Sequence, residues 1–323
     1  MGTLSTTFPG NSTVVVVGSL NLDHVVRVER LPVPGETIAG GSYLSVPGGK
    51  GLNQAVTAAR QRAPVAMVGC VGDDRAGELL RAVVSSEGIS TSALRTLRGV
   101  PSGTALITVA KDGANTIVVA AGANALLGVE DVQAASNLLG PGAVVLAQLE
   151  VPLAVVEAAL LAARQRGATT VLNPAPASAP LPLRLLSLVD VLVPNETEAC
   201  ALSGKPTALE AAAWLVAHGC RAVLVTVGKK GALLAQPGSP VLALGAYEVT
   251  AVDTTAAGDA FCGVLAVALA RGRTITEAAQ RASAAGALAT TVAGALPSLP
   301  TSDDVDALLA RSSPPEVTPL PAT

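Results

Sequence analysis

The chain has 323 residues, of which 50% are hydrophobic, 14% charged and 2% aromatic, with a formal net charge of −3. The scarcity of aromatic side chains and of clustered lysines and arginines argues against nucleic-acid binding, and four widely spaced cysteines without a C-x-x-C argue against a zinc site or a disulfide framework. No apolar run approaches the ~18 residues of a membrane-spanning helix, so we expect a cytoplasmic globular protein.

Short β-branched runs alternate with helical patterns along the chain. The first run, "TVVVVGSL", is typical of a strand that is buried on both faces. Similar runs begin near Val65, Ala143, Thr169, Val189 and Ala222. Helical patterns cover residues 51–61, 77–87, 151–166 and 208–218. This alternation predicts an α/β fold with three layers, in which helices cover both faces of a doubly wound, mostly parallel sheet.

Two segments break the alternation. Residues 20–46 carry alternating side chains, and residues 102–121 read as a hairpin around Lys111–Gly113. We expect these segments to form a small antiparallel sheet that stands off the main sheet as a β-lid. We predict a single domain over residues 12–312, with loose termini at 1–11 and 313–323.

Polar residues follow several of the predicted strands. The first strand ends in Asn21-x-Asp23, and later ones end at Asn173, at Asn195-x-x-Glu198 and at Thr226–Gly231. In open α/β sheets, ligands bind beyond the carboxyl ends of the strands, so these loops are expected to share one crevice. Two of these loops also have a simpler explanation. Asn21 could form an Asx turn, and Asn195 and Glu198 could cap a helix.

Two glycine-containing segments precede predicted helices. In "PGGKGLNQA" (47–55), adjacent glycines allow a close backbone approach to a ligand, although a tight turn before a helix explains the pattern equally well. Neither a P-loop nor the G-x-G-x-x-G fingerprint is present in the chain, which disfavours a nicotinamide dehydrogenase.

The second segment is "DTTAAGDAF" (253–261). Its backbone N–H groups at a helix start could hold an anion, and Asp259 is either a first-turn dipole partner or a base beside that anion. Phosphoryl transfer requires this pairing, because the transferred group needs N–H donors and the attacking hydroxyl needs a base.

Together these motifs resemble the ribokinase-like (PfkB) family of sugar kinases. The matching segments occur in the family's order and span roughly residues 12–312: "GSLNLDHVV", "LPVPGET", "PGGKGLNQA", "VGDDRAGE", "GANA", "QLEVP", "NPAPA", "PNETEA" and "DTTAAGDAF". Within the family, the motifs look most like those of the enzymes that phosphorylate D-ribose at its 5-hydroxyl with ATP. The chain departs from the family pattern at Leu52, at Ser283 and at Ala256, where alanine, histidine or asparagine, and glycine are commoner.

The resemblance implies roles for individual residues. Asp259 would be the general base, and the backbone of Ala256, Ala257 and Gly258 would form the anion hole. The implied sugar-binding residues are Asn21, Leu22, Asp23, Gly49, Lys50, Gly51, Leu52, Asn53, Glu150 and Asp259. The implied ATP-binding residues are Asn195, Thr226, Val227, Gly228, Lys229, Lys230, Gly231, Gly258, Asp259 and Ser283.

The resemblance also implies two metal ions. Glu198 would help to position Mg²⁺ through water. A K⁺ ion would be held behind the anion hole, largely by backbone carbonyls, at Asp253, Thr255, Ala289, Val292, Gly294 and Ser298.

We therefore expect an ATP-dependent kinase of D-ribose that needs Mg²⁺, is activated by K⁺ and forms a homodimer through its β-lid. The alternatives are a kinase of another sugar or of a nucleoside (deoxyribose, fructose or adenosine), or a catalytically silent sugar-binding regulator. The absence of additional aromatic residues near the substrate motifs argues against a nucleoside, whose base needs a stacking partner.

Overall fold

The computed structural model describes residues 13–177, 180–312 and 315–320. Within them, a large central sheet has the strand order β14-β13-β12-β11-β10-β9-β8-β1-β4-β5. Every neighbouring pair from β11 to β5 is parallel, and β12 to β14 extend the sheet through antiparallel pairs. The strands are β1 (Val14–Val17), β4 (Val65–Gly72), β5 (Leu94–Leu97), β8 (Val144–Ala147), β9 (Thr169–Leu172), β10 (Val191–Leu192), β11 (Ala222–Thr226), β12 (Ala232–Ala235), β13 (Leu242–Leu244) and β14 (Val317–Pro319).

Helices cover both faces of this sheet, as predicted. Along β1, Val14 and Val16 join one hydrophobic cluster and Val15 and Val17 join the other, because successive strand residues point to opposite faces. The first cluster includes residues of α1 (Lys50–Arg60), α2 (Arg75–Ser86), α8 (Ala257–Ala270), α9 (Ile275–Ala289), α10 (Ala295–Ser298) and α11 (Ser302–Arg311). The second includes residues of α3 (Val129–Ala134), α4 (Leu153–Gln165), α5 (Leu183–Leu186), α6 (Glu196–Ser203) and α7 (Ala208–Ala217). No helix of the described residues is long and apolar enough to cross a membrane.

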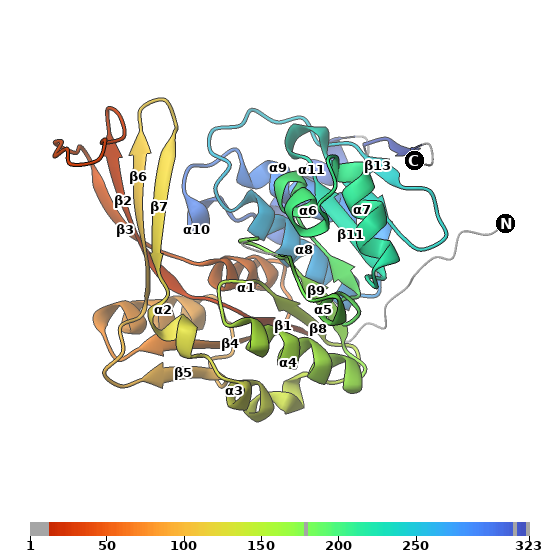
Figure 1. Ribbon diagram of the computed structural model, residues 1–323, viewed down its shortest axis with the longest axis horizontal. Helices are drawn as coiled ribbons and strands as arrows, with labels where there is room; N and C mark the ends of the chain where they lie inside the picture. Colours follow the sequence, from red (N-terminus) through yellow and green to blue (C-terminus); the bar gives the residue numbers. More distant parts are fainter. Residues whose placement is uncertain (1–12, 178–179, 313–314, 321–323) are drawn as a thin grey trace.

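A second, smaller sheet stands away from the main one and forms the lid (Figure 1). Its order is β3-β2-β6-β7, formed by β2 (Asn21–Val28), β3 (Tyr43–Gly48), β6 (Gly103–Ala110) and β7 (Asn115–Ala120). The prediction of a separate small sheet is confirmed, but its central pair, β2 and β6, is parallel rather than antiparallel. The reason is that β2 follows β1 and β6 follows β5, so both strands leave the same edge of a parallel sheet in the same direction.

The C-terminal segment differs from the loose end that the sequence predicts. Val317–Pro319 form β14, which pairs with β13 and closes that edge of the main sheet. The strand is short and exposed, so its tertiary partner determines its conformation. The predicted loose N-terminal end, 1–11, lies outside the described residues.

Candidate active site

The loop before α1 lies directly against the junction of β1 and β2. Gly49 has φ +90°, and a Cβ on it would lie 2.9 Å from the backbone N of Asn21. A Cβ on Gly51 would lie 2.5 Å from the backbone N of Ser19. The glycines of "PGGKG" are therefore required for this close approach, which brings the start of α1 beside the first strand end.

Glu150, which follows β8, anchors the start of α1. Its Oε2 accepts hydrogen bonds from the backbone N of Lys50, at 3.0 Å, and from the hydroxyl of Ser19, at 2.5 Å. A carboxylate at a helix N-terminus is favoured by the helix dipole and by the unpaired N–H groups there. Glu150 thus links the first strand end, the glycine loop and the end of β8.

Asp259 lies in the first turn of α8 and is held by two amides from α1. Asn53 donates its Nδ2 to Oδ2, and Gln54 donates its Nε2 to Oδ1, each at 2.9 Å. Only 6% of Asp259 is exposed. Burial raises the pKa of Asp259, while the Lys50 charge and the two amide bonds act in the opposite direction. The two amide bonds therefore fix the plane of the Asp259 carboxyl group, which is buried and has a raised pKa.

Asp23 brings a third acidic group to this site from the lid strand β2. Burial, followed by the negative charges of Glu150 and Asp259, raises the pKa of Asp23 to about 7. Its Oδ1 is buried without a hydrogen-bond partner in the described part of the chain, and a Cβ on Gly48 would lie 2.1 Å from its Oδ2. Such an acceptor is suited to a ligand hydroxyl, because a ligand would supply the missing donor.

Lys50 supplies a positive charge among these acids. Burial alone would lower the pKa of Lys50, but the negative charges of Asp259, Glu150 and Glu198 outweigh it and raise that pKa. Neighbouring Asn21 is 3% exposed, and its Oδ1 accepts a 2.8 Å bond from Asn124. The structure thus brings together Asn21, Asp23, Gly49 with the first turn of α1, Glu150 and Asp259.

A cavity of about 860 Å³ opens on the other side of the start of α8. Six of the predicted ATP-binding residues line it: Thr226, Gly228, Lys229, Gly231, Gly258 and Ser283. Asn195, Val227, Lys230 and Asp259 are not among the lining residues, although Asn195 forms a β-bridge to Thr226.

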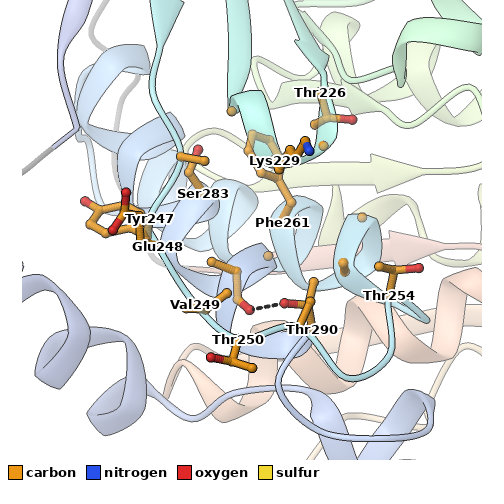
Figure 2. A pocket seen from close by; sticks show the side chains of 18 residues that line it. Thr226, Lys229, Tyr247, Glu248, Val249, Thr250, Thr254, Phe261, Ser283 and Thr290 are labelled. Carbon is orange, nitrogen blue, oxygen red and sulfur yellow. Dashed lines mark hydrogen bonds between the residues drawn. The ribbon is translucent and has the colours of Figure 1, made fainter.

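Part of the cavity wall was not predicted from the sequence. It includes residues 246–251, which belong to no recognised motif, and Phe261, the last residue of "DTTAAGDAF", for which the sequence indicated no role. Figure 2 shows Thr226 and Lys229 on one side and Tyr247 and Glu248 on the other. The hydroxyls of Tyr247 and Ser283 are buried and have no partner within the described residues.

The first turn of α8 separates this cavity from the acidic cluster. Ala256, its N-cap, has φ +59°, a left-handed conformation that is unusual for a residue with a Cβ. Ala257 donates its N–H to the carbonyl of Thr254 at 3.3 Å. The N–H groups of Gly258 and Asp259 belong to the first turn, where helix geometry leaves them without an intrahelical acceptor. They are available to an anion at this point.

Asn195 and Glu198 form the helix cap that the sequence left open as an alternative. Glu198 N–H donates to Asn195 Oδ1 at 2.8 Å, and Asn195 N–H donates to Glu198 Oε2 at 2.9 Å. Burial raises the pKa of Glu198. The described residues contain no group of three or more His, Cys, Asp or Glu that could hold a metal ion alone. A cation here would therefore need ligands from a phosphate group or from water.

The predicted K⁺ positions are only partly joined to one another. Asp253 Oδ1 accepts bonds from the N–H and hydroxyl of Thr255, and Oδ2 accepts one from the N–H of Gly294, at 2.7 to 2.9 Å. Burial opposes ionisation, but these bonds outweigh it and lower the pKa of Asp253. Ala289 and Ser298 end α9 and α10, and Val292 is exposed.

Comparison with known proteins gives one consistent result. A model of the family described as "pfkB family carbohydrate kinase" matches residues 11–302. A ribokinase of Haemophilus influenzae is 41% identical over 90% of this chain and 95% of its own length. The structure of an Arabidopsis thaliana ribokinase complexed with ribose and ATP is similar with a TM-score of 0.84, at 33% identity, over 94% of this chain and all of that one. A deoxyribokinase of Salmonella typhi is 36% identical over 78% of this chain and 84% of its own length.

Proposed function

The chain belongs to the pfkB family of carbohydrate kinases, and from this we propose that it transfers the γ-phosphoryl group of ATP to the 5-hydroxyl of D-ribose. One observation carries the proposal. The first turn of α8 lies between the cavity, which Gly258 lines, and the acidic cluster, in which Asn53 holds Asp259. Nucleotide and sugar would thus meet at one helix N-terminus.

In the proposed mechanism, Asp259 takes the proton of the ribose 5-hydroxyl. The oxygen attacks the γ-phosphorus, a new O–P bond forms, the bond to the β-phosphate oxygen breaks, and ADP leaves. The N–H groups of the first turn of α8 and the Lys50 ammonium stabilise the charge on the transferred group. Asp23, Asn21 and Glu150 bind the other sugar hydroxyls, and their fixed polar atoms select the hydroxyl pattern.

ATP would occupy the cavity between Thr226–Gly231 and Ser283. Mg²⁺, when bound with the nucleotide, neutralises phosphate charge, and Glu198 would orient it through water, since Mg²⁺ keeps several waters. K⁺ would stabilise the loop that Asp253 ties to Gly294. Four free cysteines suit a reducing compartment, and we place the protein in the cytoplasm.

The test is ADP release from MgATP with D-ribose, with and without K⁺, for the wild type and Asp259→Asn. We expect ribose-dependent turnover that K⁺ raises, and loss of about 10²–10⁴-fold of kcat in Asp259→Asn, as for removal of a general base. Turnover with 2-deoxyribose or fructose but not ribose would reassign the sugar. Turnover that survives Asp259→Asn would contradict the assigned base.

A further inference from the structure

A chain of buried amides leads to Asp259 from the ends of three parallel strands. Gln148, just after β8, donates its Nε2 to Gln54 Oε1 at 2.6 Å. Gln54 donates its own Nε2 to Asp259 Oδ1 at 2.9 Å and to Asn173 Oδ1, just after β9, at 3.1 Å. Asn173 donates its Nδ2 to the carbonyl of Val193, just after β10, at 2.8 Å. Gln54 and Gln148 are both 0% exposed.

Only one orientation of the three amide groups pairs every donor with an acceptor. The backbone carbonyl of Val193 can only accept, so Asn173 must present its Nδ2 there and its Oδ1 to Gln54. Gln54 must then present Nε2 to Asn173 and Asp259, and Oε1 to Gln148. If the Gln54 amide were turned over, its oxygen would face two other oxygens, and its nitrogen would face the nitrogen of Gln148.

We propose that Gln54, oriented by Gln148 and Asn173, is the positioning residue that holds Asp259 as a correctly directed, ionised base. The inference rests on the proposed role of Asp259 in phosphoryl transfer. Gln54 occupies one site on Oδ1 and Asn53 one site on Oδ2, which fixes the carboxylate plane. A carboxylate has about four acceptor sites, so positions remain for the sugar hydroxyl.

Gln54 acts within a field of charged groups that also affect Asp259. The charged and titratable groups that influence this carboxyl group, or that it influences, are Lys50 on α1, Glu150 after β8, Asp23 on β2, Glu198 on α6 and Cys262 on α8. Lys50 is the one cation among them. A donor amide on Oδ1 favours the same ionised form of Asp259 that Lys50 favours.

The test compares pH profiles of kcat at saturating ribose and MgATP. Gln54→Met keeps the length of the side chain but removes the donor. We expect the acidic limb of the profile to move up by about one pH unit, because a hydrogen bond to a charged group is lost. At a pH below the limb, kcat of Gln54→Met should be about tenfold lower than that of the wild type. It should recover toward the wild-type value as the pH rises, and KM for ribose should change little.

Two further variants separate positioning from general disruption. Gln148→Met removes the donor to Gln54 Oε1, so the Gln54 amide loses one of the contacts that orient it toward Asp259. The limb should move in the same direction as in Gln54→Met. Gln61→Met is the matched control, because Gln61 is 1% exposed beside the same helix but donates to the Pro300 carbonyl at 3.0 Å. It should leave the profile unchanged, whatever its effect on the melting temperature.

A measurement without turnover completes the test. The pKa of Asp259 is read from ¹³C NMR of labelled aspartate, and Asp259→Asn identifies the signal. This pKa should rise in Gln54→Met and Gln148→Met but not in Gln61→Met. An unmoved pKa, with kcat reduced equally at every pH, would overturn the positioning role. Full turnover in Asp259→Asn would instead overturn the base assignment, so the two failures are distinguishable.

Discussion

At the scale of single residues, the left-handed conformation of Ala256 stores strain at the start of α8. A residue with a Cβ costs about 1–2 kcal/mol in this conformation, whereas glycine adopts it freely but gains entropy in the unfolded chain. We predict that Ala256→Gly raises the free energy of unfolding by roughly 0.5–1 kcal/mol, the difference between these effects. Urea denaturation measures it.

The control is Ala162→Gly, in the interior of α4. There the backbone is helical, and glycine should lower the free energy of unfolding by about 1 kcal/mol. Equal destabilisation by the two substitutions would show that Ala256 carries no strain.

Asp23 makes the stability of the ligand-free protein depend on pH. The folded protein keeps a proton on Asp23 up to about pH 7, whereas the ordinary pKa of this group is 3.8. The folded state therefore binds more protons between these values, and the free energy of unfolding falls as pH rises from about 4 to 7. In Asp23→Asn this decrease should be smaller. Urea denaturation at pH 4.5 and 7.5 tests it, and identical pH dependences would contradict the raised pKa.

The sequence identified most of the acidic cluster but not the role of Gln54 and Gln148 in orienting Asp259. Asn21, Asp23 and Asp259 follow strands or begin a helix, positions where polar groups are noticeable. Gln54 lies inside the quoted motif "PGGKGLNQA", yet as a helical residue it carries no sign of a bond to a residue 205 positions away. Such a contact depends on how α1 and α8 pack, which local patterns do not specify.

At the scale of elements, the first turn of α1 is limited by its closeness to the end of β1. A Cβ on Gly51 would lie 2.5 Å from Ser19 N and 2.6 Å from Ser19 O, both backbone atoms. We predict that Gly51→Ala destabilises the fold by about 1–3 kcal/mol, despite the better helix propensity of alanine. It should also raise KM for ribose, because the first turn of α1 must shift.

Gly140→Ala is the matched control for this effect. A Cβ on Gly140 would meet no atom within 4 Å, and the φ of this residue is not positive. Thermal melts and ribose titration of both variants decide the matter. A Gly51→Ala protein as stable as the Gly140→Ala protein would show that the helix start can move aside.

Six parallel strands of the main sheet, β1, β4, β8, β9, β10 and β11, were predictable, whereas β5, β12 to β14 and the lid pairing were not. Continuous runs such as "TVVVVGSL" must be buried on both faces, and this implies parallel neighbours with helices on either side. The pairing of β2 with β6 joins residues about 80 apart, and no local pattern states its direction. For the same reason, the cavity wall at 246–251 could not be recognised from the sequence.

At the scale of the whole molecule, the lid exposes apolar side chains. On the face that carries His24, Leu106 and Val118 are 56% and 65% exposed and lie opposite each other on β6 and β7. Exposed apolar patches and sheet edges favour association. We predict a homodimer through the lids, and Val118→Asp should convert it to a monomer in light scattering at micromolar concentration.

Leu161→Asp, at a 44% exposed position on α4, should leave the dimer intact. A monomeric wild-type protein at the same concentration would contradict the lid interface. If both variants remained dimeric, the contact would lie on another surface of the molecule.

The parallel pairing of β2 and β6 joins the two lid strands from their bases outward. Asn21 and Gly103 are paired at the base of both strands, and Asn124 clamps this point through Leu20 and Asn21. Asp23 lies on the lid strand β2, whereas Asn53 and Asp259 lie on helices of the main body. If the lid opens as one unit, Asp23 moves away from Asn53 and Asp259, and we expect the rate of sugar release to follow the rate of this opening.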